Sequence, residues 1–495
     1  MKELLIILLL GSLAMKVKAQ LSGNNLMEVQ LGNIPDQEPQ YPKTIYDQFN
    51  LQYQWKGFRA FSRLEQFYST LPSVNNYTTL TQYSLNFNHH GWQAKLGNFY
   101  ETLGRGLLLR GYEIKGSVFE DRIYRVRQGF YKDVRGAFVR YGNSWFEAKA
   151  LHGKSLAGQL PPDHQDNRTD LVSAGELTFF IKDQRLGGIY LENENPGSKS
   201  RYLSFHLGGN LSDQIDYYSE LAHQLNDGSN FLSFDNSSSY GAYFSINYST
   251  TRLGVSLEWK DYHNFLVGSG LADPPSLVKE HSYKLLNRST HIGELLDERG
   301  IQLEVYCRLN EKSRLTLNHS RGENNFLEAY RFQEYFVEWY SDFTVLQIQT
   351  FFDYSIDEYK QENKRIAGGF YFTRPLPKRW SVKLETEVQQ IHRSFGSSAT
   401  FHNYYMGLIV GKSSKFSTAL VWEFTNDALA ADLASTEKVE EKRHYSGANF
   451  SYKPNSKNSL QLFAGQRRGG PACTSGICYE VLDFTGLELR WTKRF

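Results

Sequence analysis

The sequence predicts an all-β protein: one large, single-chain antiparallel β-barrel that crosses a membrane with about 24 strands (roughly 22–26). Three observations predict it. Apolar and polar residues alternate with a period of two along most of the chain, short and long connections alternate between these runs, and the chain begins like an exported protein. No later segment is apolar enough for a transmembrane helix, and the chain is polar on average. A barrel shows this hydropathy because its lipid-facing and lumen-facing residues average out.

The period of two is clear within single runs. In the stretch 252–259, Leu253, Leu257 and Trp259 share one phase, whereas Glu258 falls on the other. Residues i and i+2 lie on different faces of a helix, so the pattern indicates strands. Strands are expected at 21–32, 46–55, 58–69, 77–88, 92–102, 135–142, 144–154, 172–182, 186–194, 200–210, 213–225, 240–249, 252–264, 300–310, 314–321, 327–340, 344–357, 364–375, 380–392, 400–411, 416–425, 443–453, 459–469 and 483–495.

The connections between these runs support the same fold. Every second connection is short, as at 56–57, 142–143, 210–212, 310–313 and 412–415. The intervening connections are often long, as at 33–45, 103–134, 155–171, 226–239, 265–299, 426–442 and 470–482. Bacterial barrels have short periplasmic turns and long outer loops, so we expect both termini on the periplasmic side.

The start of the chain has the features of a secretory signal. A charged start precedes the apolar run Leu4–Leu10, and the small residues Val17 and Ala19 favour cleavage before Gln20. The apolar run is too short to span a bilayer comfortably. The expected organisation is a signal peptide at 1–19 and a transmembrane barrel at 20–495, with no separate plug domain before the first strand.

Composition and net charge limit the kinds of binding partner that we expect. The chain has 32 Tyr, 33 Phe and 8 Trp, which suits the aromatic girdles of barrels. Removing the signal lowers the 55 basic residues by three and the 53 acidic residues by one, so the mature chain is neutral. We therefore expect no nucleic-acid partner. Expected partners are outer-membrane lipid and lipopolysaccharide, the barrel-assembly machinery during insertion and, as a possibility, a plug or surface protein.

The end of the chain resembles an assembly signal of Gram-negative barrels. Leu487, Leu489, Trp491 and the terminal Phe495 share one phase, and a terminal aromatic is typical of the strand that the assembly machinery reads. Lys493 departs from this pattern, but a lysine near the interface can extend its charged end into water.

The three cysteines suggest one disulfide. Cys473 and Cys478 lie close together in a short segment between two strand-like runs, and in an oxidising compartment such a pair predicts a disulfide that pins a loop. Cys307 falls on an apolar strand face and is expected to act as a small hydrophobic residue without a partner.

The connection 103–134 is the most informative loop. It carries Arg105, Arg110, Arg122, Arg125 and Arg127. In one interpretation it folds into the lumen and forms a basic constriction. In the other it is a structured outer loop whose arginines pair with nearby Glu113, Glu120 and Asp121. The apolar run 107–109 favours packing against another part of the protein in either case.

Two parts of the sequence carry a family resemblance. The stretch 97–110 (GNFYETLGRGLLLR) with Val134-Arg-Gly136, and the end from Arg467 through Cys473 and Cys478 to Phe495, resemble a family of uncharacterised Bacteroidota outer-membrane barrel proteins with a domain of unknown function. The resemblance covers nearly the whole mature chain. It implies the outer membrane and a barrel, and it implies no reaction or substrate.

Function is less constrained than fold. The sequence contains no motif of a zinc protease, a nucleotide-binding loop or a serine hydrolase, so we expect no enzyme, no cofactor and no metal site. His152, His164, His223 and His281 fall near the expected rims, where polar residues are usually solvated. The first hypothesis is a channel or transporter for a polar solute. The second is a non-transporting barrel that serves as a structural or docking subunit of an envelope assembly.

Overall fold

The structure is a computed structural model, and it describes residues 20–157, 160–225, 238–292, 297–325, 329–395, 397–427, 442–474 and 477–495. The predicted signal peptide, residues 1–19, lies outside the described residues. Among those residues, no helix is long and apolar enough to cross a membrane.

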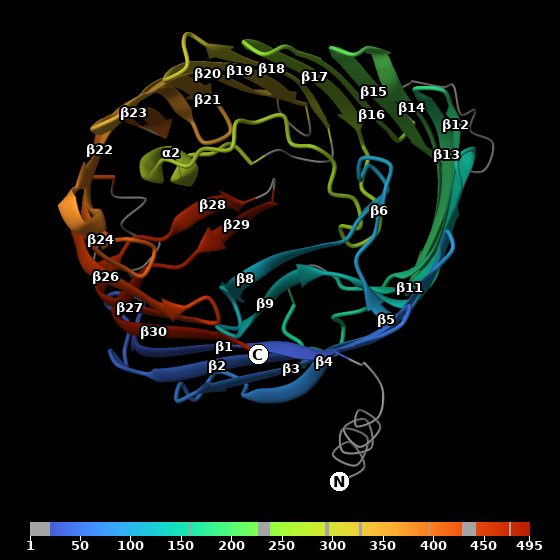
Figure 1. The fold of residues 1–495 in the computed structure, drawn as a ribbon, viewed down its shortest axis with the longest axis horizontal. Coiled ribbons are helices and arrows are strands. Elements are labelled where there is room, and N and C mark those ends of the chain that lie inside the picture. The colour runs from blue at the N-terminus through green and yellow to red at the C-terminus, as the bar shows by residue number, and fades with distance from the viewer. Residues whose placement is uncertain are drawn as a thin grey trace.

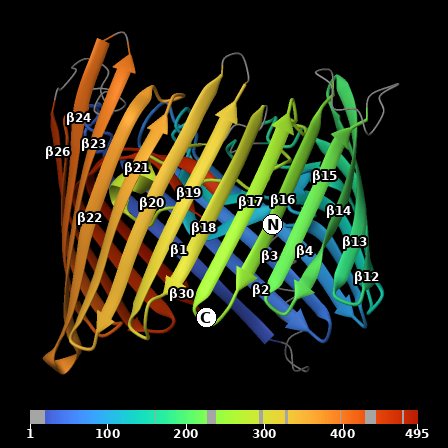
Figure 2. The same cartoon turned by 90° about the horizontal axis from the view of Figure 1, so that it is seen from above.

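Twenty-four strands form one sheet that closes on itself (Figure 1). The sheet closes where the first strand pairs antiparallel with the last, from Asn24 opposite Arg494 to Asn33 opposite Thr485. Figure 2 shows that the strands are tilted, as closure of a barrel requires. The predicted fold class and strand number are therefore confirmed.

The wall strands follow the predicted runs in order. They are β1 (Gln20–Asn33), β2 (Lys43–Trp55), β3 (Phe58–Ser69), β4 (Tyr77–His89), β5 (Trp92–Phe99), β10 (Val134–Gly142), β11 (Phe146–Ser155), β12 (Leu171–Ile181), β13 (Gln184–Asn195), β14 (Ser198–Ser212), β15 (Ile215–Gln224), β16 (Tyr240–Ser249), β17 (Leu253–His263), β18 (Glu298–Arg308), β19 (Ser313–Asn324), β20 (Tyr330–Phe343), β21 (Leu346–Asp357), β22 (Glu362–Leu376), β23 (Trp380–Phe395), β24 (Ser397–Lys412), β25 (Phe416–Thr425), β26 (Arg443–Asn455), β27 (Asn458–Arg467) and β30 (Phe484–Arg494). A short 3-10 turn, η2 (Pro377–Arg379), joins β22 to β23.

The remaining elements lie inside the ring (Figure 1). They are β6 (Thr102–Leu103), β7 (Leu109–Arg110), β8 (Tyr112–Glu120), β9 (Arg127–Lys132), α2 (Lys284–Arg288), β28 (Gly470–Thr474) and β29 (Ile477–Val481). The strands among them pair only with each other, as β6–β7, β8–β9 and β28–β29.

The two faces of the wall differ in chemistry. Large apolar side chains such as Phe205, Val388 and Leu420 are exposed on the outer face, whereas inward-facing charged side chains such as Glu65 and Glu220 are buried. This is the apolar-out, polar-in alternation of a transmembrane barrel. The inward charges are buried because the chain's own segments fill much of the lumen.

Both ends of the described chain, Gln20 and Phe495, lie near the rim that carries the short turns, which we call the short-turn rim. Gln20 pairs with Gln54 beside the Lys56–Gly57 turn, and Arg494 pairs with Asn24. Aromatic rings gather here, with Phe58 4.8 Å from Phe87 and Trp92 4.8 Å from Tyr141. One predicted turn, 210–212, is shifted, since β14 continues to Ser212.

The predicted strand 92–102 ends earlier than expected, at Phe99. Gly97 has a φ of 93°, and a Cβ there would lie 2.1 Å from the carbonyl oxygen of Tyr83. Only glycine fits such a position. After this irregular point the chain leaves the wall, enters the lumen and returns as β10, which pairs with β5.

Candidate functional site

The lumen is the candidate site, and three segments of the chain enter it (Figure 1). The first inner segment comprises residues 100–133 with β6 to β9. The second comprises 264–292 with α2, and the third comprises 468–483 with β28 and β29, apart from 475–476, which are not described. The structure thus places the predicted loop 103–134 inside the barrel.

Apolar packing fixes the first inner segment. Leu107, Leu108 and Leu109 are buried in one core cluster with Phe265 and Leu271 of the second inner segment. Tyrosines of β14 to β17 complete the cluster from the wall. Two backbone hydrogen bonds join the same segments, from Arg110 N–H to the Leu271 carbonyl at 3.1 Å and from Asp273 N–H to the Gly106 carbonyl at 3.1 Å. The apolar run 107–109 therefore lies in the interior core and not at an exposed loop tip.

Gly104 brings the first inner segment close to the wall. Its φ is 54°, and a Cβ there would lie 2.4 Å from a carboxylate oxygen of Glu220. Glu220 accepts a hydrogen bond from the backbone N–H of Arg105 at 2.8 Å. A larger residue at 104 would push this carboxylate away from the segment.

The five arginines of this segment spread through the lumen, and they do not form one ring. Their contacts are Arg105 over the Tyr218 ring at 4.9 Å, Arg110 with Asp273 at 3.6 Å, Arg122 with Glu480 at 3.1 Å, Arg125 with Glu120 at 2.9 Å, and Arg127 with Glu120 at 3.0 Å and also with Glu28. The structure brings only Arg125 and Arg127 together, on a shared carboxylate. Four of the five have a carboxylate partner, so a positive constriction stays a prediction.

Arg127 is the centre of a buried ion network. Glu28 of β1 binds Arg127 and also accepts from Nε of Arg490 at 2.6 Å. Burial raises the pKa of Glu120, but Arg127 and Arg125 outweigh it, so the pKa of that carboxyl is lowered. The ionised network ties the β8–β9 hairpin to the wall near the point where the barrel closes.

The second and third inner segments are fixed in the same way. Glu387 of β23 accepts hydrogen bonds from the backbone N–H groups of Lys284 and Leu285, both at 2.8 Å, at the start of α2. Glu423 of β25 binds Arg288 of α2 and Arg468, the latter at 3.2 Å. Negative charge at a helix start and positive charge at its end are the favourable arrangement.

The first and third inner segments also contact each other. The rings of Phe130 and Tyr479 lie 4.8 Å apart, and Arg122 binds Glu480. Together with the contacts above, these join all three inner segments into one body attached to several wall strands.

The predicted disulfide and assembly signal fall at the end of the chain. The backbone register places Cys473 directly opposite Cys478 in the β28–β29 hairpin, but their side chains lie outside the described part of the structure, so the disulfide stays a prediction. Leu487 is exposed on the outer face, and Phe495 stacks on Phe49 at 5.8 Å. The role of Leu487, Leu489, Trp491 and Phe495 in assembly also stays a prediction.

The inner segments leave several cavities. One of them, of about 810 Å³, lies beside β1 to β5 and is covered by Glu113, Lys115 and Gly116 of the first inner segment. Its lining is rich in amide side chains: Asn24, Gln48, Asn50, Gln52, Gln54, Gln82, Asn86, Asn88, Gln93 and Asn98. Arg59, Lys115 and Arg494 also line it, and none of the three forms an ion pair within the described residues. A second cavity of about 470 Å³ lies between α2, the third inner segment and the wall.

Lys132 and Asp273 lie where the first and second inner segments meet. Burial lowers the pKa of Lys132 to about 8, although Asp273 opposes this shift. Burial likewise raises the pKa of Asp273, against the effect of Arg110 and Lys132. Lys132 therefore loses its buried positive charge when the pH rises above about 8.

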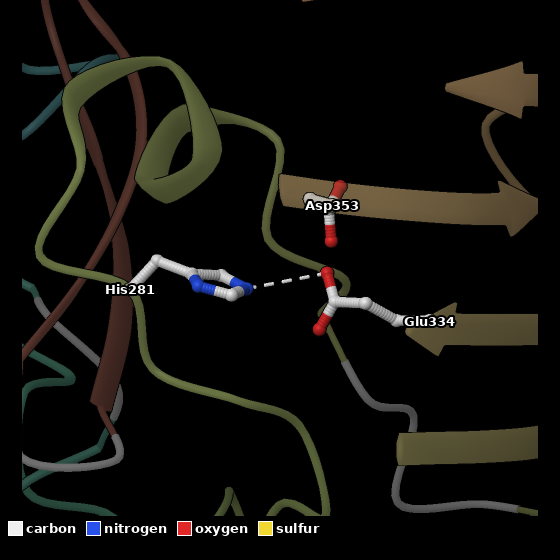
Figure 3. Close-up of side chains that lie close together, drawn as sticks. All are labelled: His281, Glu334 and Asp353. Atoms are coloured by element: carbon white, nitrogen blue, oxygen red, sulfur yellow. Dashed lines mark ion pairs between the residues drawn. The ribbon is translucent and has the colours of Figure 1, made fainter. Parts of the chain in front are cut away.

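One cluster was not expected from the sequence. His281, Glu334 and Asp353 meet inside the barrel (Figure 3). The expectation of a solvated rim histidine is wrong for His281 and also for His223, because both are buried. The sequence offered one signal: Glu334 shares the inward phase with Phe332 and Phe336, so it points into the lumen in mid-strand. Nothing in the sequence indicates that His281 meets it.

The comparisons with known proteins concern family and fold. No protein with curated annotation matches the sequence. A family model described as "Family of unknown function (DUF6029)" matches residues 1–123 and 209–495.

Several solved barrels are similar in structure. A chain of the cryo-EM structure of the E. coli P pilus tip assembly intermediate is 9% identical, with a TM-score of 0.52 over 97% of this chain and 62% of that one. The P pilus usher translocation pore PapC is 10% identical, with a TM-score of 0.48 over 96% and 99%. The siderophore receptor PirA from Acinetobacter baumannii is 8% identical, with a TM-score of 0.44 over 97% and 81%. At these identities the likeness concerns the fold alone.

Proposed function

Since this chain belongs to the family of unknown function DUF6029, whose description assigns no activity, we propose a function from the lumen itself. The protein is an outer-membrane channel for a small polar solute, and its three inner segments keep the path narrow.

The observation that carries this proposal is the amide-lined cavity. Its volume of about 810 Å³ is in the range of small-molecule sites, and its lining reaches the short-turn rim at Gly57 and Asn88. Amide side chains both donate and accept hydrogen bonds, so they can replace the water shell of a polar solute without a fixed charge preference. The three unpaired cations add a preference for solutes that carry negative charge.

The proposed location follows from the outer face of the wall. A closed barrel with an apolar outer surface satisfies its backbone internally and suits a bilayer. We infer the outer membrane of a Gram-negative bacterium, with the short-turn rim and both termini in the periplasm. Lipopolysaccharide and the barrel-assembly machinery are then its expected partners. The Bacteroidota origin, like the cleavage before Gln20, stays a prediction.

Single-channel conductance of the purified, refolded mature protein in planar bilayers tests the proposal. Discrete small steps are expected from the natural chain. A variant that lacks residues 105–130 removes most of the first inner segment, and its steps should be several times larger. Heat-modifiable migration on gels establishes that each protein has folded. A folded natural chain that stays silent, together with a folded silent deletion, would contradict a transport role.

A second candidate function is a docking subunit of an envelope assembly. The attachment of the inner segments through buried ion pairs such as Arg127–Glu28 and Arg288–Glu423 favours it, because such a body holds a fixed shape. In this case deleting 105–130 leaves ion flow unchanged and releases a plug or surface protein partner that co-purifies with the natural chain.

A further inference from the structure

The cluster of His281, Glu334 and Asp353 joins an inner segment to the wall (Figure 3). His281 belongs to the second inner segment, three residues before α2, whereas Glu334 lies on β20 and Asp353 on β21. The Nε2 atom of His281 is 3.2 Å from Oε1 of Glu334. One nitrogen or oxygen atom from each of the three side chains lies within 4.8 Å of the other two, and all three side chains are at least nine-tenths buried.

The cluster has polar atoms without hydrogen bonds. Among the described residues, neither ring nitrogen of His281 has a hydrogen-bond partner, and the same holds for Oε2 of Glu334 and Oδ2 of Asp353. The 3.2 Å contact of His281 with Glu334 is therefore close but poorly directed for a hydrogen bond. Buried polar atoms are rarely left unpaired, because their desolvation costs free energy without compensation. An occupant that accepts lone pairs from all three side chains would remove this cost.

Arg365 holds one oxygen of each carboxylate, and on Glu334 this is the oxygen nearest His281. Its Nη2 donates to Oε1 of Glu334 at 2.8 Å and its Nε donates to Oδ1 of Asp353 at 3.2 Å. Its Nη1 donates to the carbonyl of Ser289, just after α2. This orients both carboxylates, as outer hydrogen bonds orient the ligands of a metal.

The surrounding ion network carries excess negative charge. Its ion pairs link Arg365 to Glu334 and Asp353, Lys360 to Asp357, and Arg393 to Glu362 and Asp427. Five carboxylates thus face three Lys and Arg cations, with His281 against Glu334 and His291 against Asp357. A divalent cation balances this charge.

We propose that His281, Glu334 and Asp353 bind a divalent transition-metal ion of the zinc class. One imidazole nitrogen and two carboxylate oxygens are a common ligand set for such an ion, with a fourth position for water. Bonds of about 2.0–2.2 Å place tetrahedral ligand atoms roughly 3.3–3.5 Å apart. The 3.2 Å between Nε2 of His281 and Oε1 of Glu334 is close to this spacing, and movement of the Asp353 carboxylate, whose ligand atom lies within 4.8 Å of the other two, completes the set. The sequence shows no metal motif because the ligands come from three distant places in the chain.

The metal ties the second inner segment to β20 and β21. The role of the ion is structural. It links the chain just before α2 to the wall, and Arg365 makes a second link just after α2. Zinc binding therefore stabilises the filled state of the lumen.

Metal binding by the full mature protein tests this proposal. After treatment with EDTA, the purified barrel is titrated with Zn²⁺ by calorimetry, with Mg²⁺ and Ca²⁺ as comparisons. The expected result is one Zn²⁺ per chain at micromolar or tighter affinity, and no binding of Mg²⁺ at that affinity. H281Q and D353N should each weaken binding at least about tenfold. The matched control is H206Q, because His206 is also buried but lies 3.4 Å from a single carboxylate, Glu176.

A measurement on the unchanged chain keeps the proposal testable if the variants do not fold. Co²⁺ added to the EDTA-treated protein should give the intense visible bands of a four-coordinate site with one nitrogen ligand, and Zn²⁺ should abolish them. Only the weak spectrum of hydrated Co²⁺ would overturn the proposal. So would failure of the natural chain to bind Zn²⁺, or an equal loss of binding in H206Q, which would leave the cluster as an ion network without metal.

Discussion

The part of the lumen beside β1 to β5, called the hollow part, keeps a large cavity next to a smaller apolar core around Tyr46 and Phe67, whereas the part beside β10 to β17, called the solid part, holds the larger core. The hollow part keeps the cavity of about 810 Å³, lined mainly by asparagine and glutamine. In the solid part, inward-facing tyrosines such as Tyr202, Tyr218 and Tyr262 pack with Leu107–Leu109 and Phe265 into one core. The wall has the same architecture in both parts, so the inward side chains decide which part the inner segments fill.

The physical reason is the balance between packing and solvation. Aromatic side chains on the inner face offer apolar area, and burying it against a leucine run is favourable. Amide side chains gain little from such contact because they would lose hydrogen bonds to water. The hollow part therefore keeps its cavity, and the solid part anchors the inner segments.

The largest effect should come from breaking the ion network near the point where the barrel closes. R127A removes a buried cation from Glu28, which keeps Arg490, and from Glu120, which keeps Arg125, and this should lower the free energy of unfolding by about 3–5 kcal/mol. Denaturant unfolding in lipid vesicles measures it, and single-channel steps should grow at the same time.

The control for this variant is R321A. Arg321 and Glu323 form an exposed ion pair outside the lumen, and the change should cost less than about 1 kcal/mol. Equal effects of the two variants would contradict a special role for the Arg127 network.

The solid part should respond next to the loss of packing. L108A creates a cavity at a fully buried position, which should cost about 2–5 kcal/mol. L186A removes the same atoms from the outer face, where the side chain is half exposed, and should cost clearly less. If L108A proved as mild as L186A, the inner segments would not be anchored by this core.

Alkaline pH should stabilise the folded protein through Lys132, which lies where the first two inner segments meet. Lys132 has a pKa of about 8 in the folded protein against 10.5 for an ordinary lysine. Between these values the unfolded chain binds more protons than the folded one, so the free energy of unfolding rises with pH, by about 1–3 kcal/mol in all. Below pH 8 Lys132 is protonated in both the folded and the unfolded chain, so its contribution to the free energy of unfolding no longer changes with pH. Unfolding measured from pH 7 to 10.5 should show the rise in the natural chain and not in K132M, and an equal slope in both would assign it to other groups.

The smallest effect on stability should come from the hollow part. R59E and K115E change cavity-lining residues without ion-pair partners among the described residues, so the free energy of unfolding should change by less than about 0.5 kcal/mol. The ion preference of the channel should nevertheless move from anions toward cations, as reversal potentials in a salt gradient measure. An unchanged preference would place the solute path elsewhere in the lumen.

The wall could be predicted from the sequence because the alternation is local. Leu253 and Leu257 already indicate the outer phase, and the pairing of successive strands follows from short turns such as Lys56–Gly57. The inner segments could not be predicted in the same way. The sequence signals that the run 107–109 packs against something, but its partner Leu271 lies more than 150 residues away. The cluster of His281, Glu334 and Asp353 escaped prediction for the same reason, since only the closed fold brings these residues together.

The contacts across the barrel closure have a consequence for how the chain folds. Gln30 donates a hydrogen bond to Glu488, 458 residues further along the chain, and Glu28 binds Arg490. Contacts between residues so far apart in the sequence form late in folding. Closing a long loop costs chain entropy, and this cost opposes the contact until neighbouring strands are already in place. The third inner segment immediately precedes β30, so the interior can be completed only when the last strand is in place. Until then the chain exposes an unpaired sheet edge and a half-filled interior, both of which make a folding chain prone to aggregation.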